Sequence, residues 1–165
     1  MAEDIAIYTD GAARGNPGKG GYGAVLIYGT KHKEISAGYI LTTNNRMELM
    51  AVIKALELLK RNDIPVKIYT DSRYVCDAIE KGWLHNWVKK NFAGKKNADL
   101  WRELIPLLKT YKPKFIWVKG HNGHPLNERC DQLATQAADS GRLHNDEGYL
   151  VEKRNEGNNK NSLFN

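Results

Sequence analysis

Four acidic side chains are the first candidates for chemistry in this sequence. The tetrapeptide Ile-Tyr-Thr-Asp occurs twice, ending at Asp10 and again at Asp71, and each copy closes an apolar run typical of a β-strand. Glu48 and Asp131 each lie early in a stretch whose apolar residues have helical spacing. If these strand ends and helix starts converge, the repulsion among four carboxylates requires a cation, and oxygen ligands select Mg²⁺ or Mn²⁺. Two such ions about 3.5–4 Å apart can activate a water and stabilise the leaving oxygen of a phosphodiester.

Each acid also has an ordinary structural interpretation. Asp10 precedes a glycine and Asp71 precedes a helical stretch, so each could cap a turn or a helix. Asn45 and Glu48 have the spacing of a capping box with Asn45 as the N-cap. Asp131 could be a solvated acid near the start of its helix. The spacing in the sequence leaves both the capping roles and a shared metal site open.

A basic, aromatic stretch at residues 81–96 is the second candidate site. It contains five lysines and no acid, with Trp83, Trp87 and Phe92 between them. Cations that contact phosphates beside aromatic rings that contact sugars or bases are typical of nucleic-acid binding. The net charge of +6 also favours an anionic partner. The alternative is a solvated helix whose tryptophans pack on the core.

The elements that must position these residues indicate one α/β domain. Strands are predicted at 4–10, 21–29, 33–41, 66–72 and 114–120. Helices are predicted at 44–60, 74–81, 98–108 and 127–139. Short turns make the first three strands an antiparallel meander, whereas helical crossovers make the later strands parallel. We therefore expect a five-stranded mixed sheet with helices on both faces, in which the strands ending at Asp10 and Asp71 are neighbours.

Length and composition fit one folded domain. The chain has 165 residues, of which 41% are hydrophobic and 27% charged. Because no apolar run approaches about 20 residues and the N-terminus is acidic, we expect a cytoplasmic protein without a membrane partner. Cys76 and Cys130 lack CxxC spacing, and we interpret them as buried thiols. A change to polar composition predicts a domain at 1–150 and a mobile tail at 151–165.

Four motifs together resemble bacterial type 1 ribonuclease H. The motifs are TDGAARGNPGKGGYGA (9–24), TTNNRMELMA (42–51), YTDSRYV (69–75) and VKGHNGHPLNERCDQLA (118–134). The resemblance extends over about residues 4–150 and implies the ribonuclease H-like fold. It implies an endonuclease that hydrolyses the RNA strand of RNA/DNA hybrids by two-metal-ion catalysis, giving 5′-phosphate and 3′-hydroxyl ends. It also implies a monomer with no obligatory protein partner.

The same resemblance implies a role for each candidate acid. Two Mg²⁺ ions, with Mn²⁺ as a substitute, would be held by Asp10, Glu48, Asp71 and Asp131. Asp10 would contact both ions, and Glu48 would also meet a ribose 2′-hydroxyl. His121 would assist proton transfer or product release. A zinc half-site at His121 and His124 would need further ligands, which the neighbouring sequence does not offer.

A substrate surface is implied in the same way. The residues near the minor groove of the hybrid would be Gly11, Ala12, Ala13, Asn16, Asn44 and Asn45. A DNA phosphate would bind at Thr43 and Asn97, and the DNA strand would lie along the basic stretch, including Trp83, Trp87, Lys89 and Lys90.

Three positions depart from the family pattern. Arg73 stands where many relatives have Gln, Ala13 where some have Cys, and Leu41 where an Arg often completes the phosphate pocket. We expect Arg73 to contact the substrate and to exchange a base or 2′-hydroxyl contact for a phosphate contact. Leu41 is expected to weaken the binding of the DNA strand.

Two other functions would use parts of this pattern. A non-catalytic module that binds hybrids or duplex RNA would need the basic stretch but not the acids. A DNA strand-transfer or junction-cleaving enzyme would share the acids but not the Asn and Gly positions that face the hybrid. The presence of all four acids favours an enzyme, and those Asn and Gly positions favour a hybrid substrate.

Overall fold

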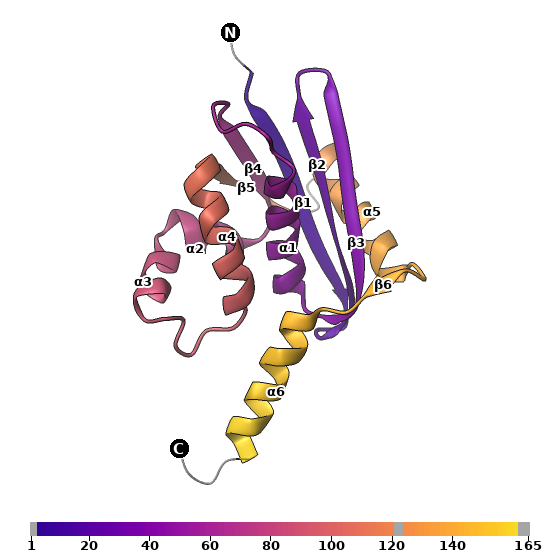
Figure 1. The fold of residues 1–165 in the computed structure, drawn as a ribbon. Coiled ribbons are helices and arrows are strands. Elements are labelled where there is room, and N and C mark those ends of the chain that lie inside the picture. The colour runs from indigo at the N-terminus through magenta and orange to yellow at the C-terminus, as the bar shows by residue number, and fades with distance from the viewer. Residues whose placement is uncertain (1–2, 121–123, 162–165) are drawn as a thin grey trace.

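The chain folds around one twisted sheet, and its computed structural model describes residues 3–120 and 124–161 (Figure 1). The strands are β1 (Ile5–Arg14), β2 (Gly18–Tyr28), β3 (Lys31–Thr42), β4 (Val66–Thr70), β5 (Lys114–Trp117) and β6 (Leu143–His144). The helices are α1 (Asn44–Glu57), α2 (Arg73–Glu80), α3 (Trp83–Lys89), α4 (Ala98–Tyr111), α5 (Pro125–Asp139) and α6 (Glu147–Asn161). None of the helices in the described residues is long and apolar enough to cross a membrane.

The sheet has the order β5-β4-β1-β2-β3-β6 and is mixed, as expected. β2 pairs antiparallel with β1 and β3, whereas β4 pairs parallel with β1 and β5. The predicted count of five strands is wrong by one, because the two residues of β6 are too few to carry a periodic pattern. Tyr8 pairs with Tyr69 and Thr9 with Thr70. The two aspartates that follow these residues therefore lie side by side at the same height. The predicted end of the first strand at Asp10 is wrong, because β1 continues to Arg14 along its antiparallel partner β2.

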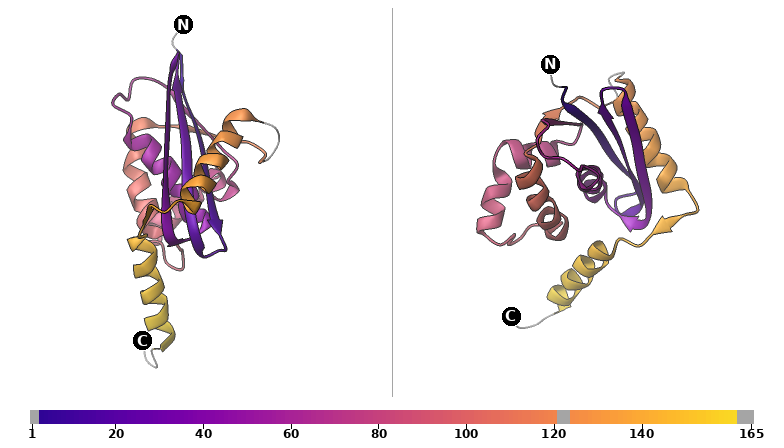
Figure 2. Two further views of the ribbon diagram at one scale, coloured as in Figure 1. Left: turned by 90° about the vertical axis from the view of Figure 1, so that its right-hand side faces the viewer. Right: turned by 45° about the horizontal axis from the view of Figure 1, so that its top comes forward.

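Helices cover both faces of the sheet. α1 packs on one face together with α2 and α4, and α5 covers the other face (Figure 2). The larger core lies under α1 and includes Ile7, Ile68, Leu49 and Trp101, all fully buried. A smaller cluster of Val25, Cys130 and Leu133 lies under α5. Cys76 and Cys130 are free, buried thiols, as predicted.

The helix caps differ from the capping interpretations of the acids. Thr43, not Asn45, is the N-cap of α1, since its side chain accepts a hydrogen bond from the Arg46 N–H (3.2 Å). Ser72, not Asp71, caps α2 by accepting from the N–H of Val75 (3.2 Å). Threonine and serine are efficient caps because their hydroxyl oxygen reaches the free N–H groups of the first turn. Neither Glu48 nor Asp71 is therefore used as a cap.

A buried arginine ties α1 to the C-terminal half of the chain. The Arg46 guanidinium donates to both carboxylate oxygens of Asp99 (2.8 and 2.7 Å) and of Asp146 (2.8 and 2.9 Å). Burial acts to lower the pKa of Arg46, but these hydrogen bonds outweigh it and raise the pKa above its ordinary value. Arg46 is thus a charged, fully compensated part of the core.

The polar C-terminal segment is helical. The predicted boundary at residue 150 falls inside α6, which begins where Asp146 accepts a hydrogen bond from the N–H of Tyr149 (3.3 Å). Tyr149 is buried, but Val151 is 47% exposed, and α6 extends away from the body of the protein (Figure 1). The division into a domain at 1–150 and a mobile tail stays a prediction.

Candidate metal and nucleic-acid site

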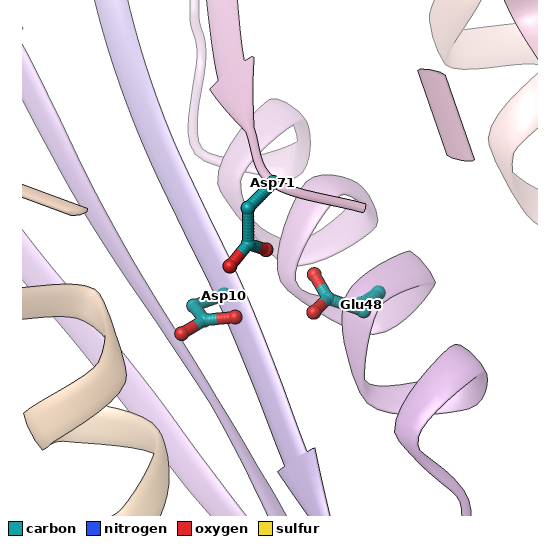
Figure 3. Close-up of side chains that lie close together, drawn as sticks. All are labelled: Asp10, Glu48 and Asp71. Carbon is teal, nitrogen blue, oxygen red and sulfur yellow. The ribbon is translucent and has the colours of Figure 1, made fainter. Parts of the chain in front are cut away.

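Three of the four predicted acids meet at one point. Asp10 comes from β1, Asp71 directly follows β4, and Glu48 comes from the first turns of α1. One carboxylate oxygen from each lies within 4.8 Å of the others, and the three side chains converge (Figure 3). Because β1 and β4 are parallel and in register, the two aspartates reach this point from the same edge of the sheet.

A glycine allows Glu48 to reach the aspartates. A Cβ atom on Gly11 would clash with the backbone N of Glu48 and would lie 2.5 Å from the Met47 carbonyl carbon. Glycine is therefore the residue that lets the start of α1 lie directly on β1. Gly11 was predicted to offer its backbone to the substrate, and its close contact with α1 is a role that the sequence did not indicate.

Two of the three carboxylates, Asp10 and Glu48, are held where their negative charge is unfavourable. Burial raises the pKa of Asp10 to about 7, and the charge of Asp71 adds to the shift. The N–H of Gly11, 2.9 Å from Asp10 Oδ1, acts in the opposite direction. Burial and the charges of Asp10 and Asp71 raise the pKa of Glu48 well above its usual range. A cation bound between these carboxylates would compensate the penalty on their ionised forms.

Glu48 gives a direct indication of a missing partner. Its Oε2 atom is buried and accepts no hydrogen bond from any of the described residues. A buried, unpaired carboxylate oxygen is costly, and a divalent cation would satisfy it. All three ligands offer oxygen, which suits a hard cation such as Mg²⁺ or Mn²⁺. The residues present therefore fit a divalent metal site.

Asp131 lies beside this group rather than in it. It is half-buried on α5 and is not among the three residues whose oxygens lie within 4.8 Å. Its charge nevertheless contributes to the raised pKa of Asp10. Asp10 pairs with Gly23, where a Cβ atom would lie 2.5 Å from the Cys130 carbonyl oxygen. This close packing of α5 on β2 brings Asp131 to the edge of the cluster.

The glycines after the first strand are mostly not turn residues. Among Gly15, Gly18, Gly20, Gly21 and Gly23, only Gly15 has a positive φ (83°). The other four lie within β2. Their missing side chains leave room for neighbouring backbone, so tertiary packing, not turn geometry, requires glycine at these positions of β2.

Aromatic rings lie two residues before each aspartate. Tyr8 and Tyr69 stack at a centroid distance of 4.6 Å, which shows that both point to the same face. His124, at the N-cap of α5, lies 5.2 Å from the Tyr8 ring. His121, predicted to assist proton transfer, lies outside the described residues.

Several predicted substrate residues share a cavity of about 220 Å³. Its lining includes Asn16, Thr43, Asn45, Lys96, Asn97 and Glu152. Asn44 lies beside it, since its N–H donates to Asn16 Oδ1 (3.1 Å). The Asn97 N–H donates to the Glu152 carboxylate (2.7 Å), so an acid of α6 occupies a donor that was expected to face a phosphate. Glu152 was missed because no sequence pattern brings a polar tail to this cavity.

Three further residues that were predicted to be near the hybrid lie along two strands. Ala12 and Ala13 follow Gly11 in β1 and are half-buried. Leu41, near the end of β3, is 37% exposed. None of these three side chains carries a charge.

The basic stretch divides its aromatic residues between core and surface. Phe92 is buried, and Trp87 packs edge-on against the buried Trp101 (5.6 Å). Trp83 is 44% exposed, and Lys89 and Lys90 are exposed. A hollow of about 420 Å³ is lined by Trp83, Asn86, Trp87, Lys90, Ala93 and Lys95. The stretch is thus partly core, as the alternative proposed, but it keeps a basic, aromatic surface.

Arg73 and Trp117 form a pair that sequence reasoning did not find. Arg73 begins α2, and its guanidinium carbon lies 3.9 Å from the centre of the Trp117 ring. The Trp117 indole N–H donates to the carbonyl oxygen of Asp71 (3.1 Å). The available signal was an aromatic residue at the end of a short strand.

Known proteins resemble this chain in both sequence and fold. The family model for RNase H matches residues 2–139. A ribonuclease H of Desulforamulus reducens is 54% identical over 82% of this chain and 88% of that protein. A ribonuclease H of Klebsiella pneumoniae subsp. pneumoniae is 53% identical over 92% of this chain and 99% of that protein.

Solved structures agree with the sequence relatives. The crystal structure of LC9-RNase H1, a type 1 RNase H with the type 2 active-site motif, has a TM-score of 0.74 and 28% identity, covering 96% of this chain and 85% of that chain. LC11-RNase H1, solved in complex with RNA/DNA hybrid, has a TM-score of 0.65 and 26% identity, covering 82% of this chain and 97% of that chain. With its motifs, fold and clustered acids, the chain belongs to the RNase H family.

Proposed function

We propose that this ribonuclease H is an endonuclease that hydrolyses the RNA strand of RNA/DNA hybrids with divalent cations held by Asp10, Glu48 and Asp71. The observation that carries the proposal is the cluster of three carboxylates, of which Asp10 and Glu48 are buried and Asp71 is half-buried. Mg²⁺ is the proposed ion, with Mn²⁺ as a substitute, because every ligand is a hard oxygen. The hybrid-bound structure of a relative with the same fold, LC11-RNase H1, supports the substrate class.

Bound divalent cations supply the activation of a water and the stabilisation of the leaving 3′-oxygen, giving 5′-phosphate and 3′-hydroxyl ends. The charges of Asp71 and of Asp131 both raise the pKa of Asp10, so Asp10 is near both acids. This supports its proposed role as the ligand common to two ions. Glu48 is proposed to accept a hydrogen bond from a ribose 2′-hydroxyl, and Asp131 to complete the ligand set from α5. His121 is proposed to assist proton transfer.

The DNA strand is proposed to lie across the polar cavity and the basic stretch. A phosphate that binds the Asn97 N–H replaces the Glu152 carboxylate, and Thr43 lines the same cavity. Lys89 and Lys90 are exposed and would contact further phosphates. Asn16, Asn44 and Asn45 carry amides suited to base edges and 2′-hydroxyl groups.

The enzyme is further proposed to act as a cytoplasmic monomer without an obligatory protein partner. All three clustered carboxylates come from one chain, which supports a site that needs no second subunit. Two buried free thiols suit a reducing compartment.

Cleavage of labelled substrates tests the proposed function. Wild type, Asp10→Asn and the control Asp63→Asn are incubated with Mg²⁺ and an RNA/DNA hybrid, duplex DNA or duplex RNA. We expect wild type and the exposed-acid control to cut only the hybrid, and Asp10→Asn to lose on the order of 100-fold or more in rate.

Each alternative has its own result in this experiment. Tight binding of an uncut hybrid would establish a binding module instead. Cleavage of duplex DNA would indicate a strand-transfer or junction-cleaving enzyme. Equal rates for wild type and Asp10→Asn would show that Asp10 is not a metal ligand.

A further inference from the structure

Trp117 contacts two residues of the site that lie on another segment of the chain. It ends β5 and pairs with Thr70, the last residue of β4. Its indole N–H donates to the carbonyl oxygen of Asp71 (3.1 Å), and its ring faces the Arg73 guanidinium at 3.9 Å. One side chain therefore touches the backbone of a clustered acid and the cation two residues after it.

Packing of the core does not account for this position. Phe115, two residues earlier on β5, is 4% exposed and fills the core, whereas Trp117 is 38% exposed. A large indole left partly in water gives up much of the free energy that burial would provide. Among the described residues, Trp117 uses its indole N–H to contact Asp71 and its ring face to contact Arg73, and these contacts indicate its structural role.

The stack leaves the guanidinium able to bind an anion. Ring contact covers one face of the planar Arg73 guanidinium, while its N–H groups lie in the plane and can donate to two phosphate oxygens. Arginine pays a considerable entropy cost when it is fixed by a ligand, and the stack fixes it in advance. Its place two residues after Asp71 puts this ordered cation next to the acid cluster.

We propose that Trp117 is a positioning residue, which orders Arg73 to bind an RNA-strand phosphate next to the cleavage site and holds the backbone of Asp71. This inference rests on the proposed cleavage of hybrids. It also gives a physical reason for arginine at position 73, because a glutamine side chain carries no charge to stack on the ring.

Two substitutions at Trp117 separate its two contacts. Trp117→Phe keeps a ring face for Arg73 but removes the N–H, so we expect a near-normal KM and a higher Mg²⁺ concentration for half-maximal rate. Trp117→Leu removes both contacts, so we expect the same Mg²⁺ effect and a KM raised about 3- to 10-fold. If Trp117 only stabilised the fold, KM and the Mg²⁺ concentration for half-maximal rate would change together in both variants.

A double-mutant cycle tests whether Trp117 acts through Arg73. Arg73→Gln should raise KM, and the Kd for the hybrid in Ca²⁺, by about 3- to 10-fold with kcat little changed. The double variant Arg73→Gln with Trp117→Leu should be no worse than the poorer single variant. Arg142→Gln removes the same charge from an exposed position and should change neither constant. Near-UV circular dichroism checks that each variant is folded.

Two results would overturn the inference. The first is multiplication of the two single effects in the double variant, which would mean that Trp117 and Arg73 act independently. The second is a KM for Trp117→Phe as high as that for Trp117→Leu. The cycle is also measured as binding of the hybrid in Ca²⁺, which does not require cleavage. A wild type that binds hybrids without cutting them would therefore refute the proposed function, and the binding cycle would still decide the role of Trp117.

Discussion

Replacing Arg46 by methionine tests whether one buried cation holds the start of α1, and with it Glu48, in place. Arg46 is fully buried, and its guanidinium donates four hydrogen bonds of 2.7–2.9 Å to Asp99 and Asp146. Methionine has a similar length and keeps an apolar stem, but it cannot donate. The change therefore removes the partner of both carboxylates with little change in volume.

The expected loss in the free energy of unfolding is about 3–5 kcal/mol, because removal of one partner leaves a buried charge uncompensated. Most of this loss should come from Asp146, whose side chain is 3% exposed. Asp99 should contribute less, since its side chain is 41% exposed and water can solvate it. At about 2–4 °C per kcal/mol for a domain of this size, Tm should fall by about 6–20 °C.

Urea unfolding of wild type, Arg46→Met and Arg61→Met measures this loss. Arg61 donates the same kind of bidentate hydrogen bonds to Asp63 (2.9 and 2.6 Å), but both side chains are more than half exposed. The control should therefore unfold almost as wild type does. An Arg46→Met loss no larger than that of Arg61→Met would refute the reasoning that burial makes this ion pair structural.

Three further perturbations test the site. In EDTA, Asp10→Asn should raise the free energy of unfolding by on the order of 2 kcal/mol at pH 8, and by less at pH 5, as measured by thermal unfolding. The reason is that the pKa of Asp10 rises from 3.8 to about 7 on folding, so the wild type loses stability as the pH rises through this window. Replacing both Lys89 and Lys90 by Gln should flatten the plot of log affinity for the hybrid against log salt by about 0.9 per lost phosphate contact; an unchanged slope would mean that these lysines are only solvated. Gly11→Ala should slow cleavage and lower the stability by about 1–3 kcal/mol, because its methyl group would collide with α1. Gly141→Ala, which meets open space, should have neither effect, and normal cleavage by Gly11→Ala would show that α1 can shift freely.

Local pattern was sufficient for most elements and for the placement of the two aspartates. Period-2 alternation and helical crossovers predicted that the strands before Asp10 and Asp71 are parallel neighbours, and their register confirms it. Sequence periodicity did not predict the elements that are short or that depend on contacts with distant parts of the chain. β6 has two residues, and α6 begins directly after Asp146, which accepts hydrogen bonds from Arg46, 100 residues earlier in the chain.

The sequence by itself determined the fold class, the identities of the acids and the family resemblance, because these depend on residue types and local periodicity. Only the tertiary structure decided which acids meet. Gly11 lets α1 bring Glu48 to the aspartates, whereas Asp131 remains beside the group on α5. The tertiary structure also decided that Glu152 fills the Asn97 donor and that Trp117 orders Arg73. Such contacts join segments far apart in the chain, and their geometry depends on close packing that no local pattern records.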